Sequence, residues 1–397
     1  MVDFRSIIRP NIYSLEPYRC ARDDFKEGIL LDANENTHGP ALSQPSDSEK
    51  QLQLNRYPDP HQEELKQQII DFRNSQPNEH SKQNLKVSNL CLGVGSDESI
   101  DMLLRCCCVP GKDKLLICPP TYGMYSICAT VNDVEIVKVP LTTPDFQIDI
   151  NAIVEKVTAD PTIKLFYLTS PGNPTAQLIN PDDIIKLLQE TDEKNWNGLI
   201  VVDEAYIDFT APKDNGHSQS MSTLVNQYAN LVVLQTLSKS FGLAGIRLGI
   251  TYCDEQLARI LNAMKYPYNI SSLTSDVAIR ATSPKKGLQV MQNYVKSIIE
   301  QREFVLEKIL QFEYVGRNIG GLDANFILVE ILDKDKKPSN EVANKLYNTL
   351  AVDNAVVVRF RGKELNCTGA LRVSIGTEEE NKVMLQKFER VLNEINK

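Results

Sequence analysis

The sequence predicts an α/β fold in which a large domain has a mainly parallel sheet between helices and is joined to a smaller α+β domain. Short, uninterrupted apolar runs alternate with helix-patterned segments through most of the chain. Such runs are typical of parallel strands that are buried on both faces. The C-terminal part instead mixes shorter strand and helix candidates. With 397 residues, the chain has length for about two domains.

The domain boundaries follow from where these two patterns meet. We expect residues 46–290 to form the large, ligand-binding domain and residues 291–397 to form the small C-terminal domain. Residues 1–45 are expected to be an N-terminal segment that associates with the small domain and the cleft.

The expected elements of the large domain are buried strands at residues 89–92, 115–117, 163–168, 199–202 and 231–234. A helix is expected over residues 181–190, because this segment opens with proline and two aspartates. In the small domain, the expected strands are 325–330, 355–358 and 371–375, and the expected helices are 340–350 and 378–395.

Charge and composition exclude several classes of function. The net charge is −9, which disfavours binding to nucleic acid or to an anionic membrane, so an anionic ligand needs a local cluster of positive charge. No stretch reaches the roughly 18 apolar residues of a membrane helix. The first twenty residues lack an apolar core and carry Asp3 and Glu16, which argues against a targeting peptide.

The nine cysteines include no CxxC pair. We interpret them as small buried hydrophobes in a reducing compartment, rather than as metal ligands or disulfides, and therefore expect a cytoplasmic protein.

We expect the functional residues directly after the strands, because ligands of open parallel sheets bind beyond the carboxyl ends of the strands. Asp203 follows the run 199–202, and an acid buried there needs a positive partner such as a protonated ring nitrogen, although it could simply cap the next helix. Lys239, in the segment TLSKSFG, follows the run 231–234. If it is desolvated it can form a Schiff base with an aldehyde; the alternative is a solvated loop lysine.

Three further strand ends carry polar or aromatic signals. The turn at residues 93–98 places glycines before a helix and so can bind a phosphate, or can be an ordinary helix cap. Arg247, bracketed by glycines, offers a forked donor for a phosphate. Asn173 lies between prolines, and Tyr122 could stack on a flat ring or belong to the core. Together, these signals match the parts of one cofactor, a phosphorylated heterocyclic aldehyde.

At this point the chain resembles the fold-type I pyridoxal-phosphate aminotransferases, and within them the histidinol-phosphate aminotransferase family. The resemblance is carried by residues 31–36 (LDANEN), 56–59 (RYPD), 120–125 (PTYGMY), 236–249 (TLSKSFGLAGIRLG) and 371–377 (LRVSIGT). The segment 236–249 is the most specific of these, in both order and spacing.

The resemblance implies that pyridoxal 5'-phosphate is the cofactor and gives roles to the matching positions. Lys239 would carry the cofactor, and Asp203 would pair with its ring nitrogen. Asn173 and Tyr206 would hold its phenolate oxygen, and Tyr122 would stack on the ring. The residues implied for the phosphate are Ser96, Asp97, Glu98, Thr236, Ser238 and Arg247.

The same resemblance implies a homodimer, because Tyr57 would reach the site of the neighbouring subunit. Arg359 and Arg372 would receive the anionic groups of the substrates, and Arg361 could exchange roles with Arg359. The remaining pocket residues would be Tyr18 and Asn34.

The implied reaction converts L-histidinol phosphate and 2-oxoglutarate into imidazole acetol phosphate and L-glutamate, in L-histidine biosynthesis. Three alternatives remain open at this point. They are another aminotransferase, for aromatic amino acids; a phosphothreonine decarboxylase of the same fold; and a regulatory module fused to a DNA reader, which the acidic charge disfavours.

Overall fold

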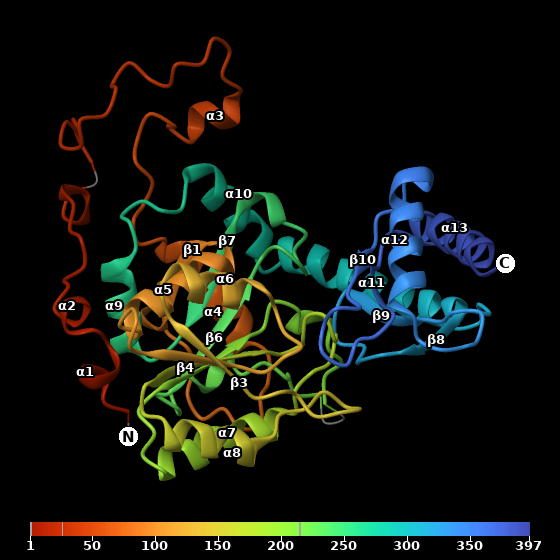
Figure 1. Cartoon of the computed structure of the whole chain (residues 1–397). Coiled ribbons are helices and arrows are strands. Elements are labelled where there is room, and N and C mark those ends of the chain that lie inside the picture. Colours follow the sequence, from red (N-terminus) through yellow and green to blue (C-terminus); the bar gives the residue numbers. More distant parts are fainter. Residues whose placement is uncertain (1, 26, 214–215) are drawn as a thin grey trace.

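The computed structural model describes residues 2–25, 27–213 and 216–397, and two sheets organise it (Figure 1). The larger sheet has seven strands in the order β1-β7-β6-β5-β4-β2-β3, and the second has four in the order β10-β11-β9-β8. The strands of the larger sheet are β1 (Leu90–Val94), β2 (Lys114–Ile117), β3 (Glu135–Lys138), β4 (Ile163–Thr169), β5 (Leu199–Asp203), β6 (Leu231–Thr236) and β7 (Leu248–Tyr252).

Helices cover both faces of the larger sheet. On one face its strand residues share a hydrophobic cluster with α4 (Glu63–Asn74), α7 (Ile150–Ala159), α8 (Pro181–Glu193) and α10 (Ser272–Thr282). On the other face the cluster includes α5 (Gly95–Cys107), α6 (Met124–Val131) and α9 (Glu255–Met264).

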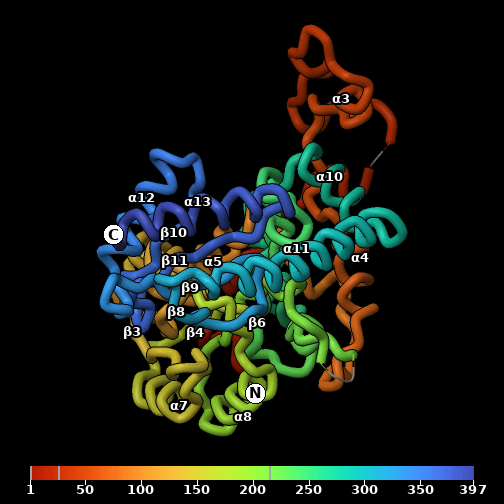
Figure 2. Tube along the Cα trace, turned by 90° about the vertical axis from the view of Figure 1, so that its right-hand side faces the viewer, coloured from red at the N-terminus to blue at the C-terminus, as the bar shows by residue number. Residues whose placement is uncertain are grey.

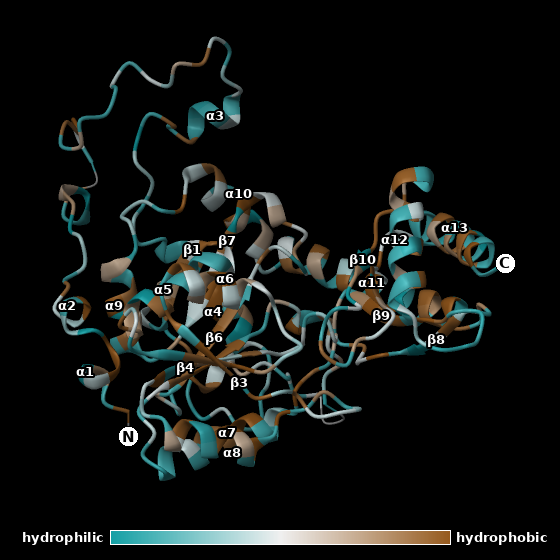
Figure 3. Ribbon diagram, in the orientation of Figure 1, coloured by the Kyte–Doolittle hydropathy of each residue, from teal (hydrophilic) through white to brown (hydrophobic). Residues whose placement is uncertain are grey.

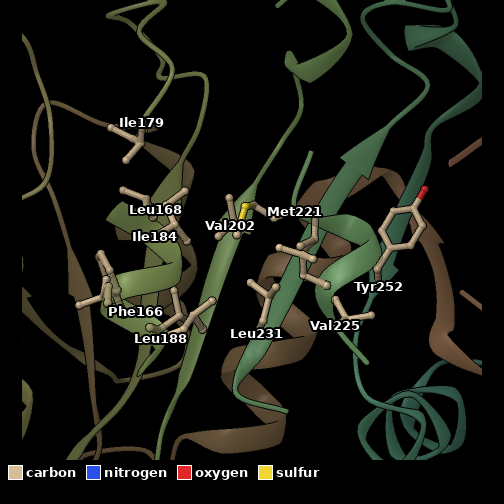
Figure 4. Packing of buried hydrophobic residues seen from close by; sticks show 14 of the residues in the cluster. Phe166, Leu168, Ile179, Ile184, Leu188, Val202, Met221, Val225, Leu231 and Tyr252 are labelled. Atoms are coloured by element: carbon tan, nitrogen blue, oxygen red, sulfur yellow. The ribbon is translucent and has the colours of Figure 1, made fainter. Parts of the chain in front are cut away.

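Successive residues of one strand enter the two clusters alternately. Ile200 and Val202 point into the first cluster, whereas Leu199 and Val201 point into the second. Figure 4 shows Val202 beside Met221, within the same cluster as Leu168, Ile184 and Leu231. The prediction of strands buried on both faces is therefore confirmed.

One strand of this sheet runs against the others. Strands β3, β2, β4, β5 and β6 are parallel, but β7 is antiparallel to both of its neighbours, β6 and β1. Because β1 runs opposite to β7, it points the same way as the parallel strands. The carboxyl ends of β1, β4, β5 and β6 therefore meet at one edge.

The second sheet is antiparallel throughout and consists of β8 (Val315–Asn318), β9 (Phe326–Ile331), β10 (Arg359–Phe360) and β11 (Ala370–Ser374). It packs with α12 (Asn340–Asn354) and α13 (Glu378–Asn396), and α11 (Gly287–Ile309) connects it to the rest of the chain. In Figure 3, α13 shows brown hydrophobic and teal hydrophilic residues side by side, as expected for a helix with one buried face.

The expected strand at residues 355–358 is wrong. Ala355 ends α12 in the left-handed region, with φ 52°, and donates its backbone N–H to the Leu350 carbonyl. The apolar run that follows is a connection to β10, and Val357 in it is exposed. The run is apolar because it joins the end of a helix to the start of a strand, and composition alone does not distinguish such a connection from a strand.

The N-terminal residues differ from the expected association with the small domain. In α1 (Phe4–Ile7), Phe4 and Ile7 join the hydrophobic cluster formed with α5 and α9 of the larger sheet. The Arg9 N–H also donates to the Cys106 carbonyl at the end of α5. The boundaries of the domains otherwise stay a prediction, and the expected boundary at 290 falls inside α11.

A long arm follows α2 (Pro10–Tyr13) and includes α3 (Asp47–Gln51). In Figures 1 and 2 the segment around α3, coloured red to orange, stands away from the body of the molecule in both views. Large apolar side chains of this arm, among them Phe25, Ile29 and Leu31, are exposed.

The cysteines behave as expected. All nine are free thiols, and all but Cys20 are buried. None of the helices in the described part of the chain combines the length and the hydrophobicity required to cross a bilayer.

Candidate active site

The carboxyl edge of the larger sheet gathers the polar residues that follow the strands. Thr169 at the end of β4 lies opposite Asp203 at the end of β5, and Thr236 ends β6 beside Gly249 of β7. The helix α5 begins directly after β1 at the same edge. The structure therefore brings these ends together, as the parallel arrangement requires.

Asp203 is a buried carboxylate with few donors. Its Oδ2 accepts from the Tyr125 hydroxyl at 2.7 Å, and its Oδ1 accepts from the Ala205 N–H at 3.2 Å. Burial raises the pKa of Asp203 to about 6, and the Tyr125 hydrogen bond opposes that shift. Within the described residues, no ion pair involves Asp203. The side chain is thus suited to a cationic ligand group, which would favour its charged form.

Lys239 follows β6 and faces this edge. Burial lowers the pKa of Lys239, the positive charge of Arg372 lowers it further, and Asp203 raises it. Its Nζ lies 5.6 Å from the centre of the Tyr206 ring. A half-buried amine with a lowered pKa is more often neutral, and therefore nucleophilic, than a solvated one. The structure thus excludes the solvated-loop alternative for this lysine.

The start of α5 forms a cup with the loop that carries Arg247. Gly95 adopts φ +75°, and a Cβ added there would lie 2.5 Å from Arg247 Nη2. A Cβ on Gly249 would lie 2.3 Å from the Gly95 carbonyl carbon, so both glycines are required for this close approach. The Arg247 Nη2 donates to Asp97 Oδ2 at 3.2 Å. Free N–H groups at a helix start and a guanidinium together favour a phosphate.

Hydroxyl groups complete the cup from β6. The Thr236 hydroxyl donates to the Ser238 hydroxyl at 2.9 Å and accepts from the Ser238 N–H at 3.1 Å. The side chain of Glu98 instead turns back and accepts from the Val94 N–H at 2.5 Å. Ser96, Asp97 and Glu98 lie in the first turn of α5, where their backbone N–H groups and the Ser96 hydroxyl are suited to an anion, while the two carboxylates are not.

The second sheet contributes the opposite side of the site. Arg372 of β11 donates from Nη1 to Asn173 Oδ1 at 2.6 Å, and its guanidinium lies over the Phe326 ring. Burial raises the pKa of Tyr206 to about 12, while the charge of Arg372 opposes this shift. Tyr122 donates its hydroxyl to Asp97 at 3.2 Å, so it lies between the cup and Asp203. Asn173 is thus held by Arg372. Burial raises the pKa of both Tyr206 and Tyr122, and both are close enough to Asp203 for its charge to raise these pKa values further.

Arg359 and Arg361 differ in how deeply their side chains are buried. Arg359 pairs with Arg372 across the strands, and Arg361 lies two residues on, so all three side chains share a face of the sheet. Arg359 is exposed, whereas Arg361 is half-buried and is close enough to lower the pKa of Tyr206. The structure therefore favours Arg361 over Arg359 as the second arginine beside Arg372.

The arm residues are not brought to this edge. Tyr57 stacks on Tyr268, with ring centres 4.7 Å apart, and Tyr18 contacts the same ring edge-on at 6.1 Å. Asn34 takes a left-handed conformation in the arm, with φ 56°. Their assigned roles in the pocket stay predictions.

Sequence reasoning missed Tyr125 and Thr169, which support Asp203. The two hydroxyls lie 2.7 Å apart, and Tyr125 is fully buried. Tyr125 lies three residues after Tyr122, at the start of α6, so the second tyrosine of the segment PTYGMY was the available signal for it.

The arrangement fits one kind of cofactor. A buried acid without a cation suits a protonated ring nitrogen, the cup suits a phosphate, and the amine of Lys239 suits an aldehyde. The fold and the site therefore define a pyridoxal-phosphate-dependent transferase of fold type I.

Comparison with known proteins supports this assignment to a class of protein. The family model of aminotransferases of class I and II matches residues 26–388. The chain is 72% identical over 396 residues to the histidinol-phosphate aminotransferase of Candida maltosa, covering 100% of each chain. It is 52% identical to that of Saccharomyces cerevisiae, covering 98% of each. The structure of the Sinorhizobium meliloti enzyme in complex with pyridoxal-5'-phosphate matches with TM-score 0.74 and 19% identity, covering 91% of this chain and 90% of that one.

The chain belongs to the class I and II aminotransferases, and within them to the histidinol-phosphate aminotransferase family.

Proposed function

We propose that this chain transfers the amino group of L-histidinol phosphate to 2-oxoglutarate, giving imidazole acetol phosphate and L-glutamate, in L-histidine biosynthesis. The observation that carries the proposal is the half-buried Lys239 beside the buried Asp203, in a chain that is 72% identical over its full length to a histidinol-phosphate aminotransferase. Pyridoxal phosphate, when bound, supplies an electron-withdrawing ring that stabilises negative charge at the substrate carbon next to the amine.

The residues of this chain then have distinct tasks. Asp203 keeps a proton on the ring nitrogen by supplying the negative charge opposite it. Lys239 would be the base that removes the proton from the substrate carbon that carries the amine. It would then return the proton on the other side of the amine nitrogen. Asn173 and Tyr206 would hold the ring through its phenolate oxygen, so that the substrate carbon lies within reach of the Lys239 amine.

Both substrates are anions, and the site meets them with arginines. Arg372 is half-buried, and burial lowers its pKa, with the neighbouring Arg361 adding to the effect. The positive charges of Arg361 and, to a smaller extent, Arg359 act on Arg372, so an anion bound beside Arg372 would relieve their mutual repulsion. We therefore assign the substrate phosphate, and in the second half-reaction a carboxylate of 2-oxoglutarate, to Arg372 and Arg361. The acidic chain thus has the local positive charge that an anionic ligand requires.

We also propose that the working form is a homodimer, in which Tyr57 reaches the neighbouring subunit's site. The arm that carries Tyr57 is ordered by its own contacts although it stands away from the body (Figure 1). The Glu35 carboxylate accepts from Arg22, from Arg56 Nη1 at 2.7 Å and from the Tyr57 N–H at 2.7 Å. A preformed arm with exposed apolar side chains is suited to a second copy of the chain.

The test is an assay that couples glutamate formation to a visible signal, with 2-oxoglutarate as acceptor and a panel of amines. We expect histidinol phosphate to be the preferred donor, over histidinol and over aromatic amino acids, and no release of carbon dioxide from phosphothreonine. The Lys239→Ala variant should lose turnover and the visible absorbance of the bound cofactor. A preference for an aromatic amino acid would overturn the proposed substrate, and an active Lys239→Ala variant would overturn the mechanism.

A further inference from the structure

A chain of buried polar side chains begins at Ser240, the residue directly after Lys239. Ser240, directly after Lys239, is only 3% exposed, and its hydroxyl donates to Asp208 Oδ2 at 2.6 Å. Asp208 belongs to the short helix η3 (Ile207–Phe209), which follows β5 and its terminal Asp203. The segments that carry the lysine and the aspartate are therefore joined a second time by this hydrogen bond.

The Asp208 carboxylate is itself fixed. It forms an ion pair with Arg73 Nη1 at 2.7 Å, and the two side chains are 12% and 6% exposed. The Arg73 Nε donates to Gln235 Oε1 of β6 at 2.8 Å. Burial lowers the pKa of Arg73, but the Asp208 carboxylate outweighs this and keeps the pKa above its ordinary value. The buried ion pair, held on its other side by Gln235, therefore provides a fixed anchor for the Ser240 hydroxyl.

The turn that carries Lys239 needs such an anchor. The Lys239 carbonyl accepts from the Gly242 N–H at 3.0 Å, and Gly242 has φ +66°, so the turn closes through a residue that restrains the backbone weakly. Two residues of this turn tie it to the buried interior: Phe241 packs edge-on against Phe72, and Ser240 supplies the side-chain hydrogen bond to Asp208. A hydrogen bond to a charged, buried acceptor restrains the backbone more strongly than a neutral one.

We propose that Asp208, fixed by Arg73, is a positioning residue for the reaction, which holds the Lys239 amine in line with the substrate carbon through the Ser240 hydroxyl. The proposal rests on the proposed role of Lys239 but not on the identity of the amine substrate. Small displacements of a reacting group slow a reaction strongly while leaving substrate binding intact. Loss of the Ser240 hydroxyl should therefore lower kcat and leave KM unchanged.

The test compares two serines of the same kind in the full-length protein. Ser240→Ala removes the proposed link. Ser220→Ala is the matched control, because Ser220 is 4% exposed and also donates to a buried carboxylate, Glu204 Oε2, at 2.7 Å. Among the described residues, the Ser220 side chain makes no hydrogen bond with the Lys239 turn, and it reaches the anchor only indirectly. The Gln235 Nε2 donates to Ser220 Oγ at 3.3 Å, while Gln235 Oε1 accepts from Arg73 Nε at 2.8 Å. Both variants are compared in kcat, in KM, in thermal stability, and in the rate at which the cofactor-free protein captures pyridoxal phosphate, followed by visible absorbance.

We expect Ser240→Ala to lose roughly tenfold or more in kcat and in capture rate, with KM unchanged, and Ser220→Ala to change only the stability. Asp208→Asn should reproduce the loss, and combining it with Ser240→Ala should add little, since both break one link. Equal losses in Ser220→Ala and Ser240→Ala, or an unaltered Ser240→Ala, would overturn the proposal. The capture rate is read without any amine, so a wrong substrate assignment would leave this result standing.

Discussion

Two arginines on one strand edge, Arg359 and Arg361, are distinguished by their exposure. Arg361 is half-buried near Tyr206, while Arg359 is exposed. We expect Arg361→Gln to raise KM for histidinol phosphate roughly tenfold to a hundredfold, because a charged hydrogen bond is worth about 1.5–3 kcal/mol. Arg359→Gln, the matched control, should change KM less. Steady-state kinetics with both variants decide between them, and a larger effect of Arg359→Gln would reverse the assignment.

A second buried acid, Glu204, makes stability depend on pH. Burial raises the pKa of Glu204 to about 7, while hydrogen bonds from Met221, Ser220 and Gln235 oppose the shift. The folded state therefore binds more protons than the unfolded state between pH values of about 4.5 and 7, so the free energy of unfolding falls as pH rises through this window.

We expect the stability of the wild-type chain, relative to a Glu204→Gln variant, to decline by up to about 3 kcal/mol as pH rises through that window. Urea unfolding of the two cofactor-free proteins at several pH values measures the difference. The substitution's own constant effect on packing cancels, because only the change with pH is compared. A difference that is independent of pH would show that Glu204 is charged throughout.

The residues to which we assign chemistry were largely predictable from the sequence, and those that contact them from distant segments were not. Asp203 and Lys239 stand directly after apolar runs, where the topology of a parallel sheet predicts a site. Tyr125 contacts Asp203 across 78 positions, and Ser240 contacts Asp208 across 32. Contacts at such separations depend on how the strands are ordered, which local patterns do not contain.

At the scale of elements, the approach of β7 to α5 depends on Gly249. A Cβ there would lie 2.3 Å from the Gly95 carbonyl carbon, so we expect Gly249→Ala to lower the free energy of unfolding by about 1–3 kcal/mol. Because the displaced helix start forms the phosphate cup, affinity for pyridoxal phosphate should fall as well. Denaturant unfolding and cofactor titration measure the two effects.

The matched control is Gly123→Ala, at the start of α6. No heavy atom lies within 4 Å of a Cβ added there, and its φ of −66° suits alanine. The free energy of unfolding should therefore stay within about 0.5 kcal/mol of the wild type. A similar loss in both variants would mean that close packing at Gly249 is not the cause.

The sheets show which elements a sequence pattern can predict. Strands β2, β4, β5 and β6 each contain at least three consecutive apolar residues, and all were expected. Strand β7 was not expected, because Gly249 and Thr251 interrupt its apolar pattern. Strand β8 contains glycine, arginine and asparagine and was missed for the same reason. Buried strands with polar or glycine residues are recognised only from their neighbours in the sheet.

At the scale of the whole molecule, the proposed position of the arm predicts how two subunits share their active sites. If Tyr57 serves the neighbouring subunit, Lys239→Ala and Tyr57→Ala damage different halves of each shared site. A mixture of the two chains, after subunit exchange, would then contain hybrid dimers with one complete site. We expect equal amounts to recover about a quarter of wild-type activity, because half of the dimers are hybrids with one working site.

Sedimentation of the wild-type chain, which should give a dimer, accompanies this mixing experiment. Activity of the mixture that equals the average of the two variants alone would contradict the shared site. A monomer that is fully active would contradict the dimer itself.

The convergence of strand ends also bears on how the chain matures in the cell. Asp203, Lys239 and the phosphate cup belong to separate strands, and the cup forms only after β7 has inserted between β6 and β1. A chain still being synthesised, or misassembled at that insertion, offers no complete binding surface to the vitamin. Bound cofactor stabilises only the fully folded chain, so a larger supply of vitamin B6 should protect that form from degradation. The cellular amount of this protein should therefore rise and fall with the supply of vitamin B6.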